Sequence, residues 1–459
     1  MTPPRNATLA RLAIASLAIH LGTATAVAQG RSMDVFRGHR PDEYQVAIFG
    51  PDRAPSPALA FRARRVLPVG TRPEDGTPIE DGVVLTRDGK IVAVGPADEI
   101  AIPASFETVD LGDAWCTPGL VDLHCHIASV TSDINDSVFQ ANPEMRTLDL
   151  VTLDHDKLRD ALAGGVTTVM YIPGSGANVG GFGTLTKTAG RSPEEALIRF
   201  PGCVKIAQGG NPTRRSGDLG ATHLGMNANL RFALQRARAY HEEHEAFERG
   251  VGPKPEFQPG LEYFRGLFRY EYPICSHSQY FQVSGVTFTM LRDEFDLWLV
   301  IVHGTFDAFR RVEMAVERGV PICAGPRQFW LDPANGRMWG IANAWYAGGK
   351  LGWPDVQPGL GIDGIGINTD SPVVDQAQLT LQAAMAVRLG LPDHVALRGL
   401  TINPAYFVGV EDRIGTIEVG KDADLAFFSG DPLDPRSHVV ATVVNGTVAY
   451  RRDPARPRF

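Results

Sequence analysis

Apolar and polar positions alternate in two different ways along the chain. In residues 58–115 the apolar runs are short and bounded by turns, and Leu59, Phe61 and Ala63 share one face of such a run. Asp88-Gly89 separates two further runs and tolerates the positive φ angle of a tight hairpin. The same pattern returns in residues 411–459. Because neither segment has enough strands to be stable alone, we expect one small β-sandwich domain built from both chain termini.

The middle of the chain, residues 116–410, repeats nearly continuous apolar runs, each followed by a helical or loop segment. Such runs are typical of parallel strands that helices cover on both faces. Seven or eight of them predict an α/β fold of the (β/α)8 barrel type. An open doubly wound sheet is the alternative, although no glycine-rich dinucleotide turn follows the first strand. The runs are 119–123, 166–172, 203–207, 272–275, 297–302, 320–324 and 362–367, with a shorter one near 183–188.

The start of the chain differs from both parts. A positively charged beginning precedes an apolar run from 12 to 21, and residues 26–28 have the small-x-small pattern of a leader cleavage site. The apolar run is short for a membrane span, although an uncleaved anchor is the alternative. We therefore expect residues 1–28 to be a signal peptide and residues 29–57 an irregular mature N-terminus. The protein would be periplasmic or extracellular, with no membrane segment after cleavage.

Composition narrows the classes of partner. The formal net charge of the 459 residues is -8, which argues against nucleic acid, because such partners require a basic face. The five cysteines are widely spaced and form no CxxC pair, so we expect free buried thiols. We expect a small-molecule substrate, and self-association into a homo-oligomer stays open.

Ligand-type residues recur at the ends of the predicted strands. His124 and His126 end the first strand and point to the same side, which suits a divalent metal ion. Such a pair alone is weak evidence. His277, His303 and Asp370 follow the fifth, sixth and eighth strands. In a barrel these strand ends meet at one face, where active sites lie. The sequence therefore predicts a metal site there.

Charged residues near the predicted barrel mouth supply further candidates. Lys205 interrupts the fourth strand, and a buried lysine needs compensation of its charge. Carbamylation by CO₂ would make it an anionic ligand between two metal ions; snorkelling to the mouth or pairing with Asp370 is the alternative. Three arginines are candidates for a bidentate contact with a substrate carboxylate, and solvated surface side chains are the alternative for each. They are Arg214, Arg215 and Arg327.

Taken together, these motifs resemble the amidohydrolase superfamily, and most closely its imidazolonepropionase-like and exported dipeptidase-like members. Residues 117–126 are similar to the opening motif of the superfamily and residues 415–425 to its closing motif. The glycine-rich run 164–181 is similar to that of the exported members, in which the fourth strand continues as Lys-x-Ala-x-Gly-Glu-Asn-Pro. Here Gly210 replaces the glutamate. This departure bears on the substrate class and the second metal ion more than on the fold.

The resemblance implies a metal-dependent hydrolase that cleaves a C–N bond of an amide or lactam, in a peptide-like or non-peptide compound. Zinc is the expected metal, with manganese or iron as alternatives. A water activated as hydroxide by the metal would attack the carbonyl carbon, and Asp370 would carry its proton to the departing nitrogen. The implied ligands are His124, His126 and Asp370 for one ion, His277 and His303 for a second, and carbamylated Lys205 between them.

Two other functions stay open at the level of sequence. A deaminase of the same superfamily would hold a single metal ion, and Lys205 would not be a ligand. A non-catalytic binding protein on the same fold would hold none, although the intact set of ligand-type residues argues against it. Metal content distinguishes the three functions.

Overall fold

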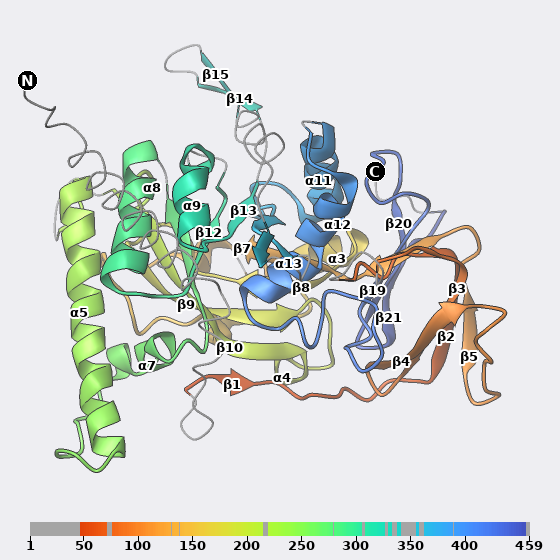
Figure 1. Cartoon of the computed structure of the whole chain (residues 1–459), viewed down its shortest axis with the longest axis horizontal. Helices are drawn as coiled ribbons and strands as arrows, with labels where there is room; N and C mark the ends of the chain where they lie inside the picture. The colour runs from red at the N-terminus through yellow and green to blue at the C-terminus, as the bar shows by residue number, and fades with distance from the viewer. Residues whose placement is uncertain are drawn as a thin grey trace, which may run out of the picture.

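The computed structural model contains two sheets, one flanked by helices and one at the opposite end of the molecule (Figure 1). The predicted leader and residues 29–45 lie outside the described part of the chain, within which no helix is long and apolar enough to cross a membrane. The described residues are 46–70, 76–129, 131–136, 138–213, 219–278, 280–304, 308–325, 329–332, 337–340, 355–357, 362–388 and 390–455.

The main sheet carries most of the predicted apolar runs in chain order. Its strands follow one another as β7, β8, β9, β10, β11, β12, β13 and β18, and β1 pairs with β10. They are β1 (Ile48–Phe49), β7 (Leu120–Cys125), β8 (Val166–Tyr171), β9 (Val179–Lys187), β10 (Leu197–Gln208), β11 (Ile274–Ser278), β12 (Leu299–Val302), β13 (Ile322–Ala324) and β18 (Ile365–Ile367). Nearly every residue of these strands from β7 onward is buried, as the continuous apolar runs predict.

The sheet is not wholly parallel. Strand β9 runs antiparallel to both β8 and β10, with Thr168 paired to Lys187 and Cys203 to Gly183. The prediction of parallel strands is therefore wrong for β9. The physical reason is the short connection 172–178, which allows an antiparallel return but not the long crossover that a parallel neighbour needs.

The two edges of the main sheet approach each other. A single parallel bridge joins Cys125, at the end of β7, to Ser371, just after β18. The amide of His126 donates to the carbonyl oxygen of Ser371 at 2.8 Å. Within the described residues no continuous ladder closes the sheet, so the structure shows an α/β fold whose edges meet at this one point.

Helices cover the main sheet. The longest, α5, begins at His223, where the Thr222 hydroxyl caps the amide of Gly225 at 3.1 Å. Leu230 and Leu234 lie in the same apolar cluster as Val204 of β10, so the helix is anchored to the sheet. The helices are α3 (Asp156–Ala163), α4 (Pro193–Ala196), α5 (His223–Glu248), α6 (Pro259–Glu262), α7 (Phe264–Phe268), α8 (Phe281–Phe288), α9 (Val312–Glu317), α11 (Leu379–Arg388), α12 (Asp393–Leu400) and α13 (Ile402–Phe407).

The second sheet combines strands from both ends of the chain. Strand β6 pairs with β19, so that Thr117 lies opposite Ala426. The described strands form one eight-stranded sheet, and the two-layered sandwich stays a prediction. They are β2 (Leu59–Val66), β3 (Ile79–Arg87), β4 (Lys90–Pro96), β5 (Glu107–Asp110), β6 (Trp115–Pro118), β19 (Leu425–Phe428), β20 (Val439–Val444) and β21 (Thr447–Arg451). Two hairpins complete the strands: β14 (Phe329–Asp332) with β15 (Arg337–Gly340), and β16 (Asp355–Gln357) with β17 (Ile362–Asp363).

A buried ion cluster joins the two sheets. Lys187, at the end of β9, is 1% exposed and lies 3.0 Å from Asp422 and in contact with Asp424. Burial alone would raise the pKa of Asp422, but the nearby cations Lys187, Arg413 and Lys90 outweigh it and lower that pKa to about 2. The cluster therefore fixes the second sheet to the end of β9.

Candidate metal centre

The carboxyl ends of the main-sheet strands bring together the six predicted ligand residues. His124, Lys205 and His277 belong to strands β7, β10 and β11. The other three, His126, His303 and Asp370, come within three residues of the ends of β7, β12 and β18. All of them are buried except Asp370, whose side chain is 15% exposed. The residues that were singled out at or near the strand ends therefore meet in space.

Asp370 forms a compact trio with the first two histidines. Its Oδ1 lies 3.1 Å from Nε2 of His124 and 3.3 Å from Nε2 of His126. One ligand atom of each residue lies within 4.8 Å of those of the other two. Nδ1 of His126 donates to the carbonyl oxygen of Ile172 at 2.8 Å, so Nε2 is the ring nitrogen that faces Asp370. Imidazole nitrogens and a carboxylate oxygen are a donor set that fits zinc and related ions.

The remaining two histidines lie next to this trio. Nδ1 of His277 is 2.6 Å from Nε2 of His303, and the His303 ring stacks on that of His124 with 4.6 Å between centroids. The Ser175 hydroxyl lies 2.9 Å from the same Nδ1 of His277. A second group of ligand-type nitrogens therefore adjoins the first, with a hydroxyl beside it.

Burial keeps these imidazoles in the uncharged form. It lowers the pKa of His124 well below its usual value, and Lys205 lowers it further. The pKa of His277 is lowered by burial and then by His303. Burial lowers the pKa of His303 to about 4, although Asp370 opposes the shift. Neutral imidazole is the form that binds metal ions, so the histidines fit the expected role.

Lys205 lies beside the trio as the sequence predicts. Its side chain is fully buried, and Nζ is 3.3 Å from Nε2 of His124. Burial lowers the pKa of Lys205 to about 8, and Asp370 opposes the shift. Snorkelling to solvent does not describe this side chain. The amine therefore lies among the candidate ligand residues.

The backbone is strained at two of the predicted ligand residues. His303 has a φ of 43° and Asp370 a φ of 52°, values that side-chain-bearing residues adopt rarely. Such conformations persist only where the surrounding structure enforces them, and they concentrate at functional sites. Next to Asp370, the backbone is held by Asp122. Its Oδ2 accepts hydrogen bonds from the Thr369 hydroxyl at 2.6 Å and from the Gln376 side chain at 3.0 Å. Sequence reasoning missed Asp122 because it reads as an ordinary residue of the opening motif.

The glycine-rich run that carries Ser175 is held in place. The Asn135 side chain fills the space beside Gly174 and Gly176, where an added Cβ would come within 2.5 Å of its atoms. Oδ1 of Asn135 also accepts from the Gly176 amide at 2.7 Å. The contacts show a fixed loop that presents Ser175 to His277, which sequence reasoning also missed.

The other predicted residues divide into two groups. Gly210 has a φ of 64° and follows Gly209 at 79°, so a left-handed turn stands where the resemblance to the exported members leads us to expect glutamate. The three candidate substrate-binding arginines lie outside the described residues, and their role stays a prediction. They are Arg214, Arg215 and Arg327.

Several known proteins are similar to this chain in sequence and fold. Residues 379–450 match the model of the amidohydrolase family. A solved amidohydrolase from Thermotoga maritima MSB8 is 30% identical, with a TM-score of 0.74 over 86% of this chain and 100% of that one. The chain therefore belongs to the amidohydrolase superfamily, which is generally metal-dependent and acts on C–N bonds. The resemblance drawn from residues 117–126 and 415–425 is confirmed.

Two further relatives are aligned over most of this chain. The amidohydrolase tasK of Hapsidospora irregularis is 27% identical over 406 residues, which are 81% of this chain but only 39% of that protein. An imidazolonepropionase of Brucella anthropi is 25% identical over 397 residues, covering 80% of this chain and 92% of that enzyme.

Proposed function

We propose that this protein is a metal-dependent hydrolase that cleaves the C–N bond of an amide or lactam in a small peptide-like or non-peptide molecule. The observation that carries the proposal is the convergence of His124, His126 and Asp370, whose ligand atoms lie within 4.8 Å of one another. Membership of the superfamily supports the reaction class, and the imidazolonepropionase relative supports a cyclic amide among the substrates to be tested.

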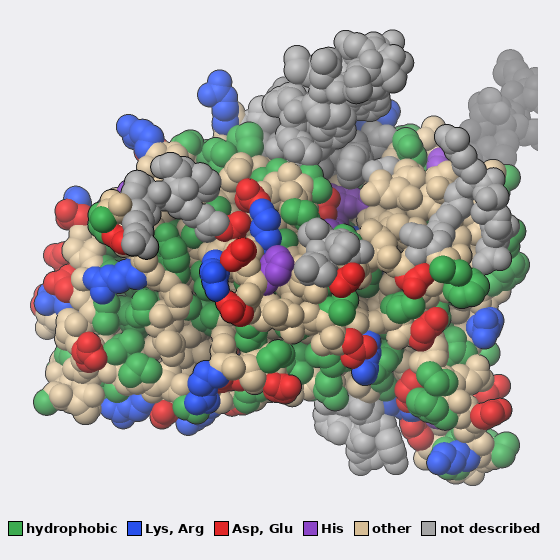
Figure 2. Space-filling view, turned by 180° about the vertical axis from the view of Figure 1, so that it is seen from behind, with side chains coloured by type: hydrophobic (Ala, Val, Ile, Leu, Met, Phe, Trp, Pro, Cys, Tyr) green, Lys and Arg blue, Asp and Glu red, His purple; other side chains and the backbone are tan. Residues whose placement is uncertain are grey.

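The fold supports the proposed position of the site. We propose that the main sheet is a (β/α)8 barrel with one antiparallel strand, and the bridge between Cys125 and Ser371 supports its closure. On the face shown in Figure 2, acidic and basic side chains are interspersed and neither forms a large continuous patch. Such a surface supports a small-molecule substrate rather than a polyanion.

The chain's own residues suggest a division of roles. His124, His126 and Asp370 would hold one ion, His277 and His303 a second, and carbamylated Lys205 would bridge them. A bound divalent ion supplies a Lewis acid and lowers the pKa of water to about 7. Asp370 is the one partly exposed member of the trio, so its carboxylate can reach substrate and carry a proton to the departing nitrogen. Burial lowers the pKa of His124, His277 and His303, so these imidazoles stay neutral and orient the site.

A deaminase with one metal ion is the second candidate. The observation that favours it is that only one compact group of three ligand-type residues occurs among the described residues, and His277 and His303 are not in it. Lys205 would then remain an amine beside His124. Counting metal ions per chain decides between the two functions.

Metal removal tests the proposed function directly. We expect chelation to lower hydrolysis at least about tenfold, and zinc or manganese to restore it, because water is a poor nucleophile without the ion. Dipeptides, N-acyl amino acids and cyclic amides should be screened by product release, with total metal measured on the same sample. A metal-loaded protein that binds members of the panel but converts none would refute the proposal.

Lys205→Ala tests the bridging ligand separately. We expect the variant to lose about one metal ion per chain, because an anionic ligand shared by two ions is removed. Metal content by mass spectrometry is the readout, with circular dichroism to check the fold. Lys157→Ala is a suitable control, because Lys157 pairs with Asp375 at the surface. Unchanged metal content in Lys205→Ala would remove the bridging role.

A further inference from the structure

Helix α5 leaves one whole face open along the outer edge of the molecule (Figure 1). Its opposite face is buried through Met226, Leu230, Leu234, Ala237 and Tyr240. The open face carries residues at spacings of three or four, which alternate from Phe232 onward as in a helix-pairing seam. Leu224 is 82% exposed and Phe232 55% exposed. The seam consists of Leu224, Ala228, Phe232, Gln235, Ala239, Glu242 and Ala246.

Charges along α5 are segregated into two halves. Residues 223–238 hold three arginines and no acidic residue, whereas residues 239–248 hold four glutamates and no lysine or arginine. The glutamates of the last turn oppose the helix dipole, whereas the arginines lie more than two turns inside the helix, beyond the reach of the dipole at its N-terminus. The helix therefore has a basic half and an acidic half.

The chain itself compensates only part of this pattern. Arg231 pairs with Glu294 at 2.7 Å, and Glu245 pairs with Arg269 at 2.6 Å. On the open face, Arg236, Glu242 and Glu243 are exposed and form no ion pair with any described residue. Arg236 and Glu243 therefore flank the seam on the same side, one sign in each half of the helix, and Glu242 lies in the seam itself.

We propose that this face of α5 packs antiparallel against α5 of a second copy of the chain, about a two-fold axis. An antiparallel pair sets the basic half of each helix against the acidic half of its mate, which matches the segregation of charge. An axis near Ala239 places Arg236 beside the partner's Glu243, which lies on the same flank of the seam, and Phe232 against the partner's Ala246. The small side chain of Ala239 lets the two helices approach closely. An anionic membrane fits this face poorly, because membrane-surface helices are rich in lysine and arginine.

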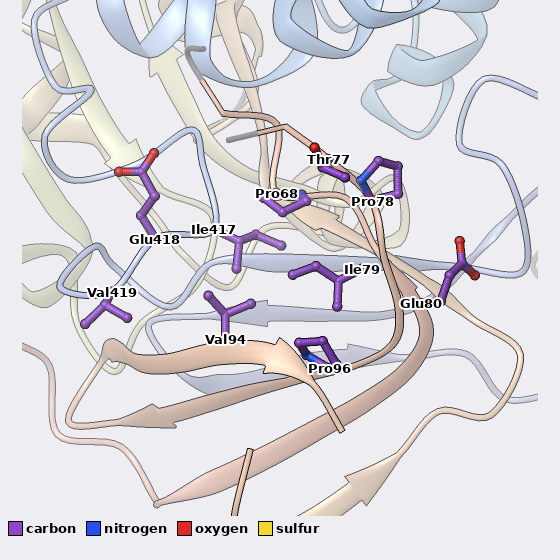
Figure 3. Close-up of a pocket in the computed structure, with 10 residues that line it drawn as sticks. All are labelled: Pro68, Thr77, Pro78, Ile79, Glu80, Val94, Pro96, Ile417, Glu418 and Val419. Carbon is purple, nitrogen blue, oxygen red and sulfur yellow. The ribbon is translucent and has the colours of Figure 1, made fainter. Parts of the chain in front are cut away.

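Sedimentation of the purified protein tests whether the dimer exists. We expect a species of twice the monomer mass, and Phe232→Glu should raise its dissociation constant about 30-fold or more, because a charge enters the apolar contact at two symmetric places. Val419→Glu is the matched control, since Val419 is 64% exposed and lines a surface pocket of the second sheet (Figure 3). A monomer at all concentrations, or a dimer equally stable in Phe232→Glu, would overturn the proposal.

Two further variants test the antiparallel geometry. Arg236→Glu should weaken the dimer, and the double variant Arg236→Glu with Glu243→Arg should restore it, because the pairs are re-formed with reversed sign. Ala239→Cys should give a covalent dimer on mild oxidation, since the five natural cysteines are buried. Val419→Cys should stay monomeric on a non-reducing gel. Failure of the charge swap to restore the dimer, together with no cross-link at position 239, would exclude this interface.

Discussion

Replacing Asp370 with asparagine is expected to lower kcat about a hundredfold to ten-thousandfold, the range that a positioned proton carrier supplies. The amide keeps the size of the side chain but carries no negative charge and cannot accept the proton. Oδ1 of Asp370 faces Nε2 of both His124 and His126, at 3.1 and 3.3 Å, so the substitution also removes the anionic member of the trio. The loss of the proton acceptor and the loss of the negative charge would both slow the same hydrolytic step.

Steady-state kinetics on the substrate found by the screen, with metal content measured in parallel, checks this result. Asp375→Asn is the matched control, because Asp375 lies five residues further along the chain and its side chain is 41% exposed. It should retain wild-type kcat. If Asp370→Asn keeps full turnover with its metal bound, Asp370 is not the proton carrier. If turnover and metal content fall together, its main role is that of a ligand.

Replacing Lys187 with methionine is expected to lower the free energy of unfolding by about 3–5 kcal/mol, the usual cost of breaking a buried ion pair from one side. Methionine fills most of the space of the lysine stem, so loss of packing is small. Asp422 and Asp424 would face each other without the cation between them. Burial raises the pKa of Asp424 even with Lys187 in place. The variant therefore leaves a buried negative charge without its main partner.

Urea unfolding followed by circular dichroism measures the effect. Lys157→Met is the control, because Lys157 is 35% exposed in its pairs with Asp160 and Asp375, and such pairs contribute at most about 1 kcal/mol. Equal losses in the two variants would show that the cluster at Lys187 contributes no more than a surface pair. A loss confined to Lys187→Met would show that the cluster holds the two sheets together.

Most of the fold follows from the hydrophobic pattern, and the exception has a physical reason. Continuous apolar runs predict buried strands, and β7, β8 and β10 to β13 lie where these runs occur. Strand β9 could be located near 183–188, but its direction depends on the connection from β8, which the pattern of apolar residues does not report. The length of that connection does indicate the direction of β9, because a turn of a few residues returns the chain antiparallel.

The candidate site was predictable only for residues with a ligand-type side chain. Histidines and an aspartate at strand ends stand out, and the structure places His124, His126 and Asp370 together. Ser175 and Asp122 carry no such signal. A serine in a glycine-rich run and an aspartate inside a strand are common, and their contacts with His277 and Thr369 depend on the folded backbone. The predicted leader and export of the protein stay predictions.

The pairing of β6 with β19 also has a consequence for synthesis of the protein on the ribosome. Thr117 and Ala426, which face each other across these strands, are 309 residues apart. At translation rates of about 5–20 residues per second, the edge of β6 that pairs with β19 stays unpaired for on the order of 15 to 60 s, until β19 has been synthesised. An unpaired strand edge can pair with another chain during this interval. The nascent protein is therefore most prone to aggregation before its last fifty or so residues are made, a window in which a chaperone that covers strand edges would raise its yield.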